Sequence, residues 1–238
     1  MSATVAIIPA RGGSKGIPRK NLINICGRPL MAWSILHARL AKGVDAVYVT
    51  SDSDEILTVA QRYGALPIER PPDISGDRAS SESAWLHALD TIEASGVEIA
   101  RIFGLQATSP LRDPGDIEGA LEQYQREELD SLFSVAEVED FFTWRIDENG
   151  QPRSVNYDWR HRRPRQLIEK RYLENGSIYL FSPTVLRREK NRMGGRLGVF
   201  VMPRHKLFQI DNLEDMKLAE TIMHGYGLDR IGDPESKR

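Results

Sequence analysis

Cysteine is nearly absent from this sequence: Cys26 is the only one among 238 residues. A single cysteine excludes an internal disulfide and any zinc site built from several cysteines. No apolar run approaches the roughly 18 residues that a membrane-spanning helix needs, so no membrane partner is expected. The first residues also lack the basic stretch, apolar core and cleavage site of a secretory signal. We therefore expect a cytoplasmic protein.

An excess of charge of one sign is also missing. The chain has 32 basic and 34 acidic residues, which gives a formal net charge of -2. A dedicated nucleic-acid-binding domain usually carries a clear basic excess, so no nucleic-acid partner is expected. Hydrophobic residues make up 40% of the sequence, enough for a sizeable core. The length predicts a single domain over residues 1–238.

Short apolar strands alternate with amphipathic helical stretches along most of the chain. Expected strands lie at residues 4–8, 46–50, 66–68, 99–105, 131–135, 176–181 and 198–202. Expected helices lie at residues 30–40, 56–63, 84–92 and 114–124, from 183, and after 211. Repeated βα units predict a three-layer α/β fold, in which helices cover a mostly parallel sheet. Residues from about 225 onward are expected to form a loosely held tail.

The alternation stops at about residues 141–166. Residues 142–146 and 153–157 flank an Asp-Glu-Asn-Gly segment, which indicates a small hairpin with an Asn-Gly turn. Segments that leave a regular core and expose aromatic side chains often form lids or subunit contacts. We predict a dimerisation or lid insertion here, and hence a homodimer.

The first strand leads into a loop, residues 11–21, that combines small and basic residues. It holds three glycines, a serine, an asparagine and the cations Arg11, Lys15, Arg19 and Lys20. Glycines let backbone N–H groups approach an anion, and cations neutralise it. A P-loop would need Ser or Thr after Lys15, and a dinucleotide fingerprint would need glycine in place of Ser14. We predict a polyphosphate-binding loop of another kind; the alternative is a solvated basic turn.

Two more polar turns, residues 51–54 and 106–112, follow predicted strands. Open α/β sheets bind ligands at the carboxyl ends of their strands. We therefore expect these turns to meet the glycine loop at one site.

Five ordered segments of the chain resemble the motifs of the CMP-sialic acid synthetases, the acylneuraminate cytidylyltransferase family. They are residues 8–21, the Arg70-Pro71 loop with Ser80 and Ser81, residues 105–112, Arg165-Gln166 with 172–179, and residues 210–215. The resemblance covers nearly the whole chain and implies a Rossmann-like nucleotidyltransferase fold. The implied reaction transfers CMP from CTP to the anomeric hydroxyl of a nonulosonic acid, a nine-carbon 2-keto sugar acid, and releases pyrophosphate. The implied cofactor is Mg²⁺ or Mn²⁺.

The same resemblance implies roles for individual residues. Catalytic roles are implied for Arg11, Lys20 and Asp211, the last as the metal ligand. Contacts to CTP are implied for Arg11, Gly12, Lys15, Asn21, Ser80 and Ser81. Contacts to the sugar acid are implied for Gln106, Arg165, Gln166, Asn175 and Tyr179. A guanidinium such as that of Arg165 can grip the acceptor's carboxylate through two hydrogen bonds, whereas Tyr179 fits the core of a strand equally well.

The chain departs from the family pattern beside the expected metal ligand. Many family members have Asp-x-Asp, whereas this chain has Gln209-Ile210-Asp211. Mg²⁺ takes one or two carboxylates together with phosphate oxygens and waters, so the number of metal ions stays open. Asp215 is either a further ligand or a charge at a helix N-terminus. The general base is unassigned; a metal-bound water or the substrate itself would serve.

Alternative functions remain at this point. Enzymes for legionaminate and pseudaminate share these motifs, so the acceptor is open, and other 2-keto-3-deoxy sugar acids are further candidates. Octulosonate enzymes usually have a different glycine loop, and the Asn175-Gly176 segment argues against them. A nucleotide-binding regulator with weakened catalysis is favoured by Gln209 alone.

Overall fold

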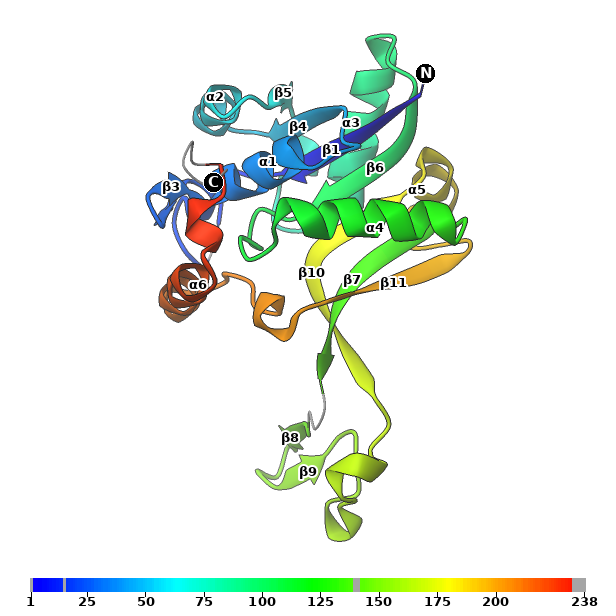
Figure 1. Cartoon of the computed structure of the whole chain (residues 1–238). Coiled ribbons are helices and arrows are strands. Elements are labelled where there is room, and N and C mark those ends of the chain that lie inside the picture. The colour runs from blue at the N-terminus through cyan, green and yellow to red at the C-terminus, as the bar shows by residue number, and fades with distance from the viewer. Residues whose placement is uncertain (1, 15, 139–141, 233–238) are drawn as a thin grey trace.

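The structure, a computed structural model, describes residues 2–14, 16–138 and 142–232 (Figure 1). Its centre is a seven-stranded sheet, and the strands follow the order β11-β7-β10-β6-β1-β4-β5. In chain order these strands are β1 (Ala3–Pro9), β4 (Ala46–Ser51), β5 (Leu66–Glu69), β6 (Ile99–Leu105), β7 (Ser131–Val138), β10 (Arg171–Phe181) and β11 (Leu197–Met202). Strand β10 runs antiparallel to both of its neighbours, and the other pairs are parallel. The predicted three-layer α/β fold is confirmed.

Strand β1 lies between β6 and β4, and its inner residues are buried on both faces of the sheet. Ile8 lies opposite Val49 of β4, and Ile7 lies opposite Gly104 of β6. A continuous run of apolar residues is typical of a parallel strand that helices cover on both sides.

Helices on both faces complete the three layers. They are α1 (Leu30–Leu40), α2 (Asp54–Arg62), α3 (Ser81–Ala94), α4 (Pro114–Arg126), α5 (Pro183–Glu189) and α6 (Leu213–Tyr226). Apolar residues of α1, α2 and α4 form one core cluster, whereas those of α3 and α5 form a second cluster on the opposite face. Trp85 of α3 is fully buried there, as its helical spacing predicts. No helix within the described residues is both long and apolar enough to cross a membrane.

Helix α6 and the residues after it differ from the expected loose tail. Gly227, with φ +68°, ends the helix in the left-handed conformation that favours glycine. Leu228 then packs into a third core cluster, which also contains Trp33 and Ile17. The chain is therefore held to the body at least as far as Ile231, which packs against the same cluster.

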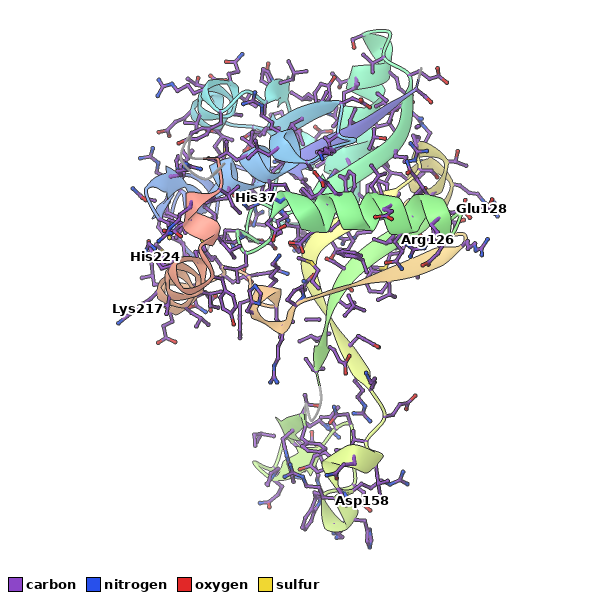
Figure 2. The ribbon with its side chains drawn as sticks, in the orientation of Figure 1. His37, Arg126, Glu128, Asp158, Lys217 and His224 are labelled. Carbon is purple, nitrogen blue, oxygen red and sulfur yellow. The ribbon has the colours of Figure 1, made fainter. Side chains whose placement is uncertain are left out.

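An arm, defined here as described residues 142–170, extends from the paired ends of β7 and β10 (Figure 1). It carries the short hairpin β8 (Trp144–Ile146) and β9 (Pro152–Ser154), so the predicted hairpin is confirmed with shorter strands. The Asp147 carboxylate accepts hydrogen bonds from the backbone N–H groups of Asn149 and Gln151 and shapes the turn. Figure 2 shows Asp158 at the far end of the arm, away from the sheet.

Candidate active site

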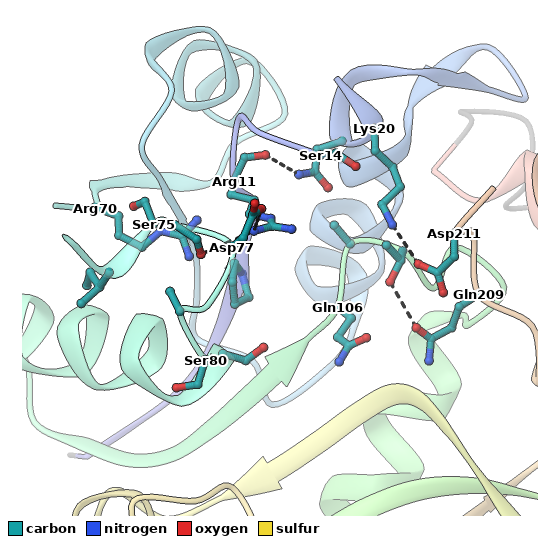
Figure 3. A pocket seen from close by; sticks show the side chains of 18 residues that line it. Arg11, Ser14, Lys20, Arg70, Ser75, Asp77, Ser80, Gln106, Gln209 and Asp211 are labelled. Carbon is teal, nitrogen blue, oxygen red and sulfur yellow. Dashed lines mark hydrogen bonds and ion pairs between the residues drawn. The ribbon is translucent and has the colours of Figure 1, made fainter. Parts of the chain in front are cut away.

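The carboxyl ends of β1 and β6 open into a cleft of about 380 Å³ (Figure 3). Four segments line it: the glycine loop, the loop before α3, the turn after β6, and the segment before α6. Their polar lining residues are Arg11, Ser14, Lys20, Asn21, Arg70, Ser75, Asp77, Ser80, Ser81, Gln106, Thr108, Gln209 and Asp211. The glycine loop and the 106–112 turn thus meet at one site, as expected. The 51–54 turn does not line the cleft but supports the loop, because Asp52 Oδ1 accepts a hydrogen bond from Gly12 N at 2.8 Å.

The glycine loop is held in place by its own polar side chains. Buried Asn21 donates a hydrogen bond from Nδ2 to the carbonyl of Arg11 at 2.9 Å. The Arg11 guanidinium reaches across the cleft to Asp77, with 3.0 Å between Nη1 and Oδ1. Asn21 therefore fixes the backbone from which Arg11 points into the cleft. Lys15, the other cation predicted to bind CTP, lies outside the described residues.

Lys20 forms an ion pair with Asp211 across the cleft, with 2.8 Å between Nζ and Oδ1 (Figure 3). The two backbones approach closely here: a Cβ added to Gly16 would lie 2.6 Å from the Asp211 carbonyl oxygen. The Asp215 carboxylate accepts hydrogen bonds from the N–H groups of Asp211 and Asn212. Asp215 is thus part of a capping box at the start of α6, which leaves Asp211 as the carboxylate of this segment that lines the cleft.

Arg70 also lines the cleft, although the sequence predicted no individual role for it. It is only 6% exposed, yet its Nε and Nη2 have no hydrogen-bond partner among the described residues. Burial, and then the nearby Arg11, lower the pKa of its guanidinium, and Asp52 opposes them. A buried cation whose N–H donors lack acceptors is costly unless a ligand supplies them. Its place directly after β5, at the ligand-binding edge of the sheet, was the available signal.

Helix α3 begins at the cleft. Ser80 is its N-cap, and its Oγ accepts a hydrogen bond from Ser83 N at 3.1 Å. Ser81 is the first residue of the helix, so both predicted CTP contacts lie at the positive end of a helix dipole.

Gly12 lies close to the 51–54 turn: a Cβ there would be 3.1 Å from Ser53 Cβ.

Gln106 and Gln209 are uncharged polar residues that line the cleft away from Arg70, where the Lys20–Asp211 ion pair also lies (Figure 3). Gln209 Oε1 accepts a hydrogen bond from Thr108 Oγ1 at 3.3 Å, and Gln209 Nε2 donates to the carbonyl of Asn175 at 2.7 Å. The cleft therefore places neutral amides next to charged groups.

Two predicted sugar contacts lie inside the body rather than at the cleft. Asn175 is 1% exposed, and its amide bonds to Ser134 Oγ and to the carbonyl of Lys206. Tyr179 is buried on the α3 face, where it contacts Trp85, and its hydroxyl donates a hydrogen bond to Glu174. Neither side chain lines the cleft, because side chains of β10 point into the two core layers.

The other two predicted sugar contacts belong to the arm. Gln166 is exposed and does not line the cleft. The side chain of Arg165 lies outside what the structure describes. Among the predicted sugar-binding side chains that the structure describes, Gln106 alone lines the cleft.

The donor set at Asp211 fits a divalent cation that arrives with a triphosphate. No group of three or more His, Cys, Asp or Glu residues suited to a metal occurs within the described ranges. Mg²⁺ does not need such a group, since it commonly uses one carboxylate with phosphate oxygens and waters. The Asp211 side chain is 70% exposed and therefore accessible to such an ion. The Gln209 amide is bonded to Thr108 and Asn175 and adds no charge.

Comparison with known proteins decides the family. Residues 5–217 match the family described as Cytidylyltransferase. The chain belongs to this family. The predicted enzyme class, a CTP-dependent nucleotidyltransferase, is thereby confirmed, and so is the resemblance to acylneuraminate cytidylyltransferases.

Two relatives and one solved structure illustrate the similarity. Pseudaminic acid cytidylyltransferase of Campylobacter jejuni subsp. jejuni serotype O:23/36 is 33% identical over 222 residues, which cover 92% of this chain and 95% of that protein. N-acylneuraminate cytidylyltransferase of Oncorhynchus mykiss is 33% identical over 238 residues, 98% of this chain but 53% of that longer protein. The structure of CMP:2-keto-3-deoxy-manno-octonic acid synthetase complexed with CTP superposes with a TM-score of 0.71 at 18% identity. That alignment covers 94% of this chain and 100% of the other, and it shows the fold alone.

Proposed function

We propose that this protein transfers CMP from CTP to the anomeric hydroxyl of a nonulosonic acid and releases pyrophosphate. The observation that carries the proposal is a single cleft lined by both cations and neutral amides. The cations are Arg11, Arg70 and Lys20, and the amides are those of Gln106 and Gln209. This combination suits an anionic nucleotide beside a polyhydroxylated sugar acid. The names of two relatives, a pseudaminic acid and an N-acylneuraminate cytidylyltransferase, favour the same class of acceptor.

In this proposal the nucleotide extends along the cations of the cleft, from Arg70 past Arg11 to Lys20. Cytosine presents oxygen and nitrogen acceptors, and buried Arg70 has guanidinium donors that lack a partner within the described chain. Ser80 and Ser81 adjoin this position at the start of α3. The triphosphate then lies between Arg11 and Lys20, where the charges are complementary.

The chemical step is a displacement at the α-phosphorus of CTP. The anomeric oxygen of the acceptor forms a bond to this phosphorus, the bond to pyrophosphate breaks, and the hydroxyl proton passes to water. Negative charge grows on the leaving pyrophosphate, so a fixed cation nearby stabilises the transition state more than the ground state. Asp211 holds the Lys20 ammonium in the cleft before substrates arrive, which reduces the reorganisation needed during the reaction.

We also propose Mg²⁺ or Mn²⁺ as the cofactor, with Asp211 as its protein ligand. A divalent cation bound there supplies positive charge to the triphosphate. The backbone N–H of Asp211 donates a hydrogen bond to the Asp215 carboxylate. Because CTP is made in the cytoplasm, we propose that the reaction takes place there.

The arm supports a homodimer. Its exposed Trp144, Trp159 and Leu167 are large apolar side chains of the kind that subunit contacts cover. The double substitution Trp144→Ser with Trp159→Ser should shift the mass measured by light scattering from dimer to monomer. A wild-type monomer would contradict the dimer and leave the proposed reaction in place.

Pyrophosphate release tests the reaction directly. The wild-type protein is incubated with CTP, Mg²⁺ and, one at a time, neuraminic, pseudaminic and legionaminic acids and an octulosonic acid. We expect release with at least one nine-carbon acid and none without an acceptor. Folded protein that releases no pyrophosphate with any acid would contradict the enzyme. If it still binds CTP, the nucleotide-binding regulator becomes the better reading.

A further inference from the structure

Strand β10 loses its regular pairing with β7 between Glu174 and Tyr179. Gly176, in the middle of this gap, has φ +61°, which favours glycine over other residues. Backbone groups in such a gap need other partners. Side chains from outside β10 supply them for three successive carbonyls: Gln209 donates to Asn175, Ser109 to Gly176, and Arg112 to Ser177.

Of these three side chains, Gln209 faces the cleft, whereas Ser109 and Arg112 are buried. A Cβ built on Gly176 would lie 2.0 Å from Gln209 Nε2 and 3.1 Å from Gln106 Oε1. Both amide groups therefore converge on the same stretch of β10 backbone. Gln209 joins this stretch to Thr108, in the turn that carries Gln106.

The hydrogen bonds of Gln209 require an uncharged amide. The Asn175 carbonyl needs a donor, and the Thr108 hydroxyl donates to an acceptor. Among side chains of this length, an amide supplies both at once, whereas a carboxylate lacks the donor. The Gln209 amide has two N–H groups and an oxygen with two lone pairs. The contacts to Asn175 and Thr108 use one N–H group and one lone pair, so the amide can form further hydrogen bonds.

We propose that Gln209 determines acceptor specificity. With Gln106 and Thr108 it forms a neutral subsite, called here the amide subsite, which takes an acylamino or hydroxyl substituent of the sugar acid. The acceptor's carboxylate is directed instead to the cations of the cleft, because the amide subsite itself supplies no counter-charge. This inference rests on the proposed function, since it assumes that a sugar acid occupies the cleft.

A site that donates and accepts hydrogen bonds discriminates against acceptors that lack the matching group, because its own polar atoms are then left unpaired. The amide subsite should therefore distinguish two acceptors that differ only in one substituent. A residue with a merely structural role would lower the turnover of both acceptors by the same factor.

The test compares Gln209→Met with a matched control, Gln123→Met. Gln123 also donates from its amide to a strand carbonyl, that of Val199 at 3.1 Å, but it does not line the cleft. For each variant, kcat and KM are measured for two acceptors that differ in one acylamino or hydroxyl group. The Kd for CTP is measured by calorimetry in the absence of acceptor.

For Gln209→Met we expect the acceptor KM to rise about tenfold or more, and the kcat/KM ratio between the two acceptors to change by about tenfold. The Kd for CTP should stay within about twofold, and Gln123→Met should change none of these values. Gln209→Glu keeps the side-chain length, removes the donor and should likewise raise the acceptor KM.

Two results would overturn the inference while the proposed function stands. One is an unchanged ratio between the acceptors, and the other is a loss of CTP affinity as large as the rise in acceptor KM. No pyrophosphate release by the wild-type protein would contradict the proposed function itself, and this inference with it.

Discussion

Lys20 and Asp211 are 191 residues apart in sequence, yet Lys20 Nζ lies 2.8 Å from Asp211 Oδ1. The contact ties the glycine loop to the segment before α6 across the mouth of the cleft. The lysine side chain is 16% exposed, whereas the aspartate side chain is 70% exposed. Because the exposed Asp211 carboxylate gains little from the ion pair, replacing this contact by contacts to a phosphate or a metal ion costs little free energy. The ion pair therefore orients Lys20 and still allows it to bind a ligand.

Replacing Lys20 by Met should lower kcat more than it weakens CTP binding. We expect kcat to fall about 100-fold or more, because the ammonium stabilises charge that develops on the leaving pyrophosphate. The Kd for CTP should rise by less than about tenfold, since other cations remain. Single-turnover kinetics and calorimetry separate the two effects. Lys42→Met, at an exposed position outside the cleft, serves as the control; equal losses of kcat and affinity would show that Lys20 acts only in ground-state binding.

Replacing Arg70 by Met should have opposite effects on stability and on binding. The substitution removes a buried guanidinium that is only partly compensated, so the Tm without ligand should rise. The Kd for CTP should increase about tenfold or more, and the increase in Tm caused by saturating CTP should shrink accordingly. Differential scanning fluorimetry measures both. A lower Tm without ligand together with an unchanged CTP shift would show that Arg70 is structural.

The spacing of apolar residues located the strands and helices, and local composition located the glycine loop, because each depends on residues close in the sequence. The direction of β10 was not predictable in this way, because it follows from the arm. The arm returns the chain to the sheet at the same end at which β7 leaves it, so β10 runs antiparallel to β7. The gap at Gly176 depends on Gln209 and Arg112, which approach from elsewhere in the chain. Contacts between residues that are distant in the sequence also bury Asn175, which was expected to contact the sugar. Such contacts likewise leave nitrogens of the Arg70 guanidinium without a partner within the described residues, which the sequence does not show.

Replacing Asp211 by Asn should weaken the binding of a divalent cation. The variant keeps the shape of the side chain but removes the charge that a hard cation prefers. We expect the Mn²⁺ affinity of the CTP complex, measured by electron paramagnetic resonance, to fall about tenfold. Asp215→Asn is the matched control: it should cost about 1 kcal/mol of stability through the α6 cap and leave Mn²⁺ affinity unchanged. The reverse pattern would make Asp215 the ligand.

His37 should make the protein less stable in mild acid. His37 lies in α1 (Figure 2). Its ring is fully buried, and neither nitrogen has a hydrogen-bond partner within the described residues. Burial first, and then nearby Arg112, Lys206 and Arg28, hold its pKa well below the ordinary value. Below about pH 6.5 the unfolded chain binds a proton that the folded protein excludes, so the free energy of unfolding falls by up to about 1.4 kcal/mol per pH unit.

His37→Leu should remove this pH dependence, because the variant has no group to protonate at that position. Urea unfolding at pH 5, 6 and 8 measures the slope. The exposed arm residue His161 provides the control, and His161→Gln should keep the wild-type slope between pH 5 and 6.5. A slope retained by His37→Leu would assign the acid sensitivity to other groups.

Cys26 should react slowly with alkylating agents despite its partial exposure. Burial, together with the carboxylates of Glu220 and Asp229, raises the pKa of its thiol to about 11, and the thiolate is the reactive form. The rate of iodoacetamide labelling, followed by mass spectrometry, should keep rising up to about pH 11. Glu220→Gln should speed labelling at pH 8, whereas Glu214→Gln should not. A rate that levels off near pH 8.5 would contradict the raised pKa.

The residues proposed to bind the nucleotide and the sugar differ in how readily they can change over evolutionary time. At Gly16, in the glycine loop, an added Cβ would lie 2.6 Å from the Asp211 carbonyl oxygen, so the proposed nucleotide site has few alternatives. The Gln209 side chain binds the Asn175 carbonyl where β10 does not pair with β7. A substitution of Gln209 therefore leaves the remaining β7–β10 pairing in place. We therefore expect descendants of one ancestral enzyme to keep CTP and to diversify in the sugar they activate.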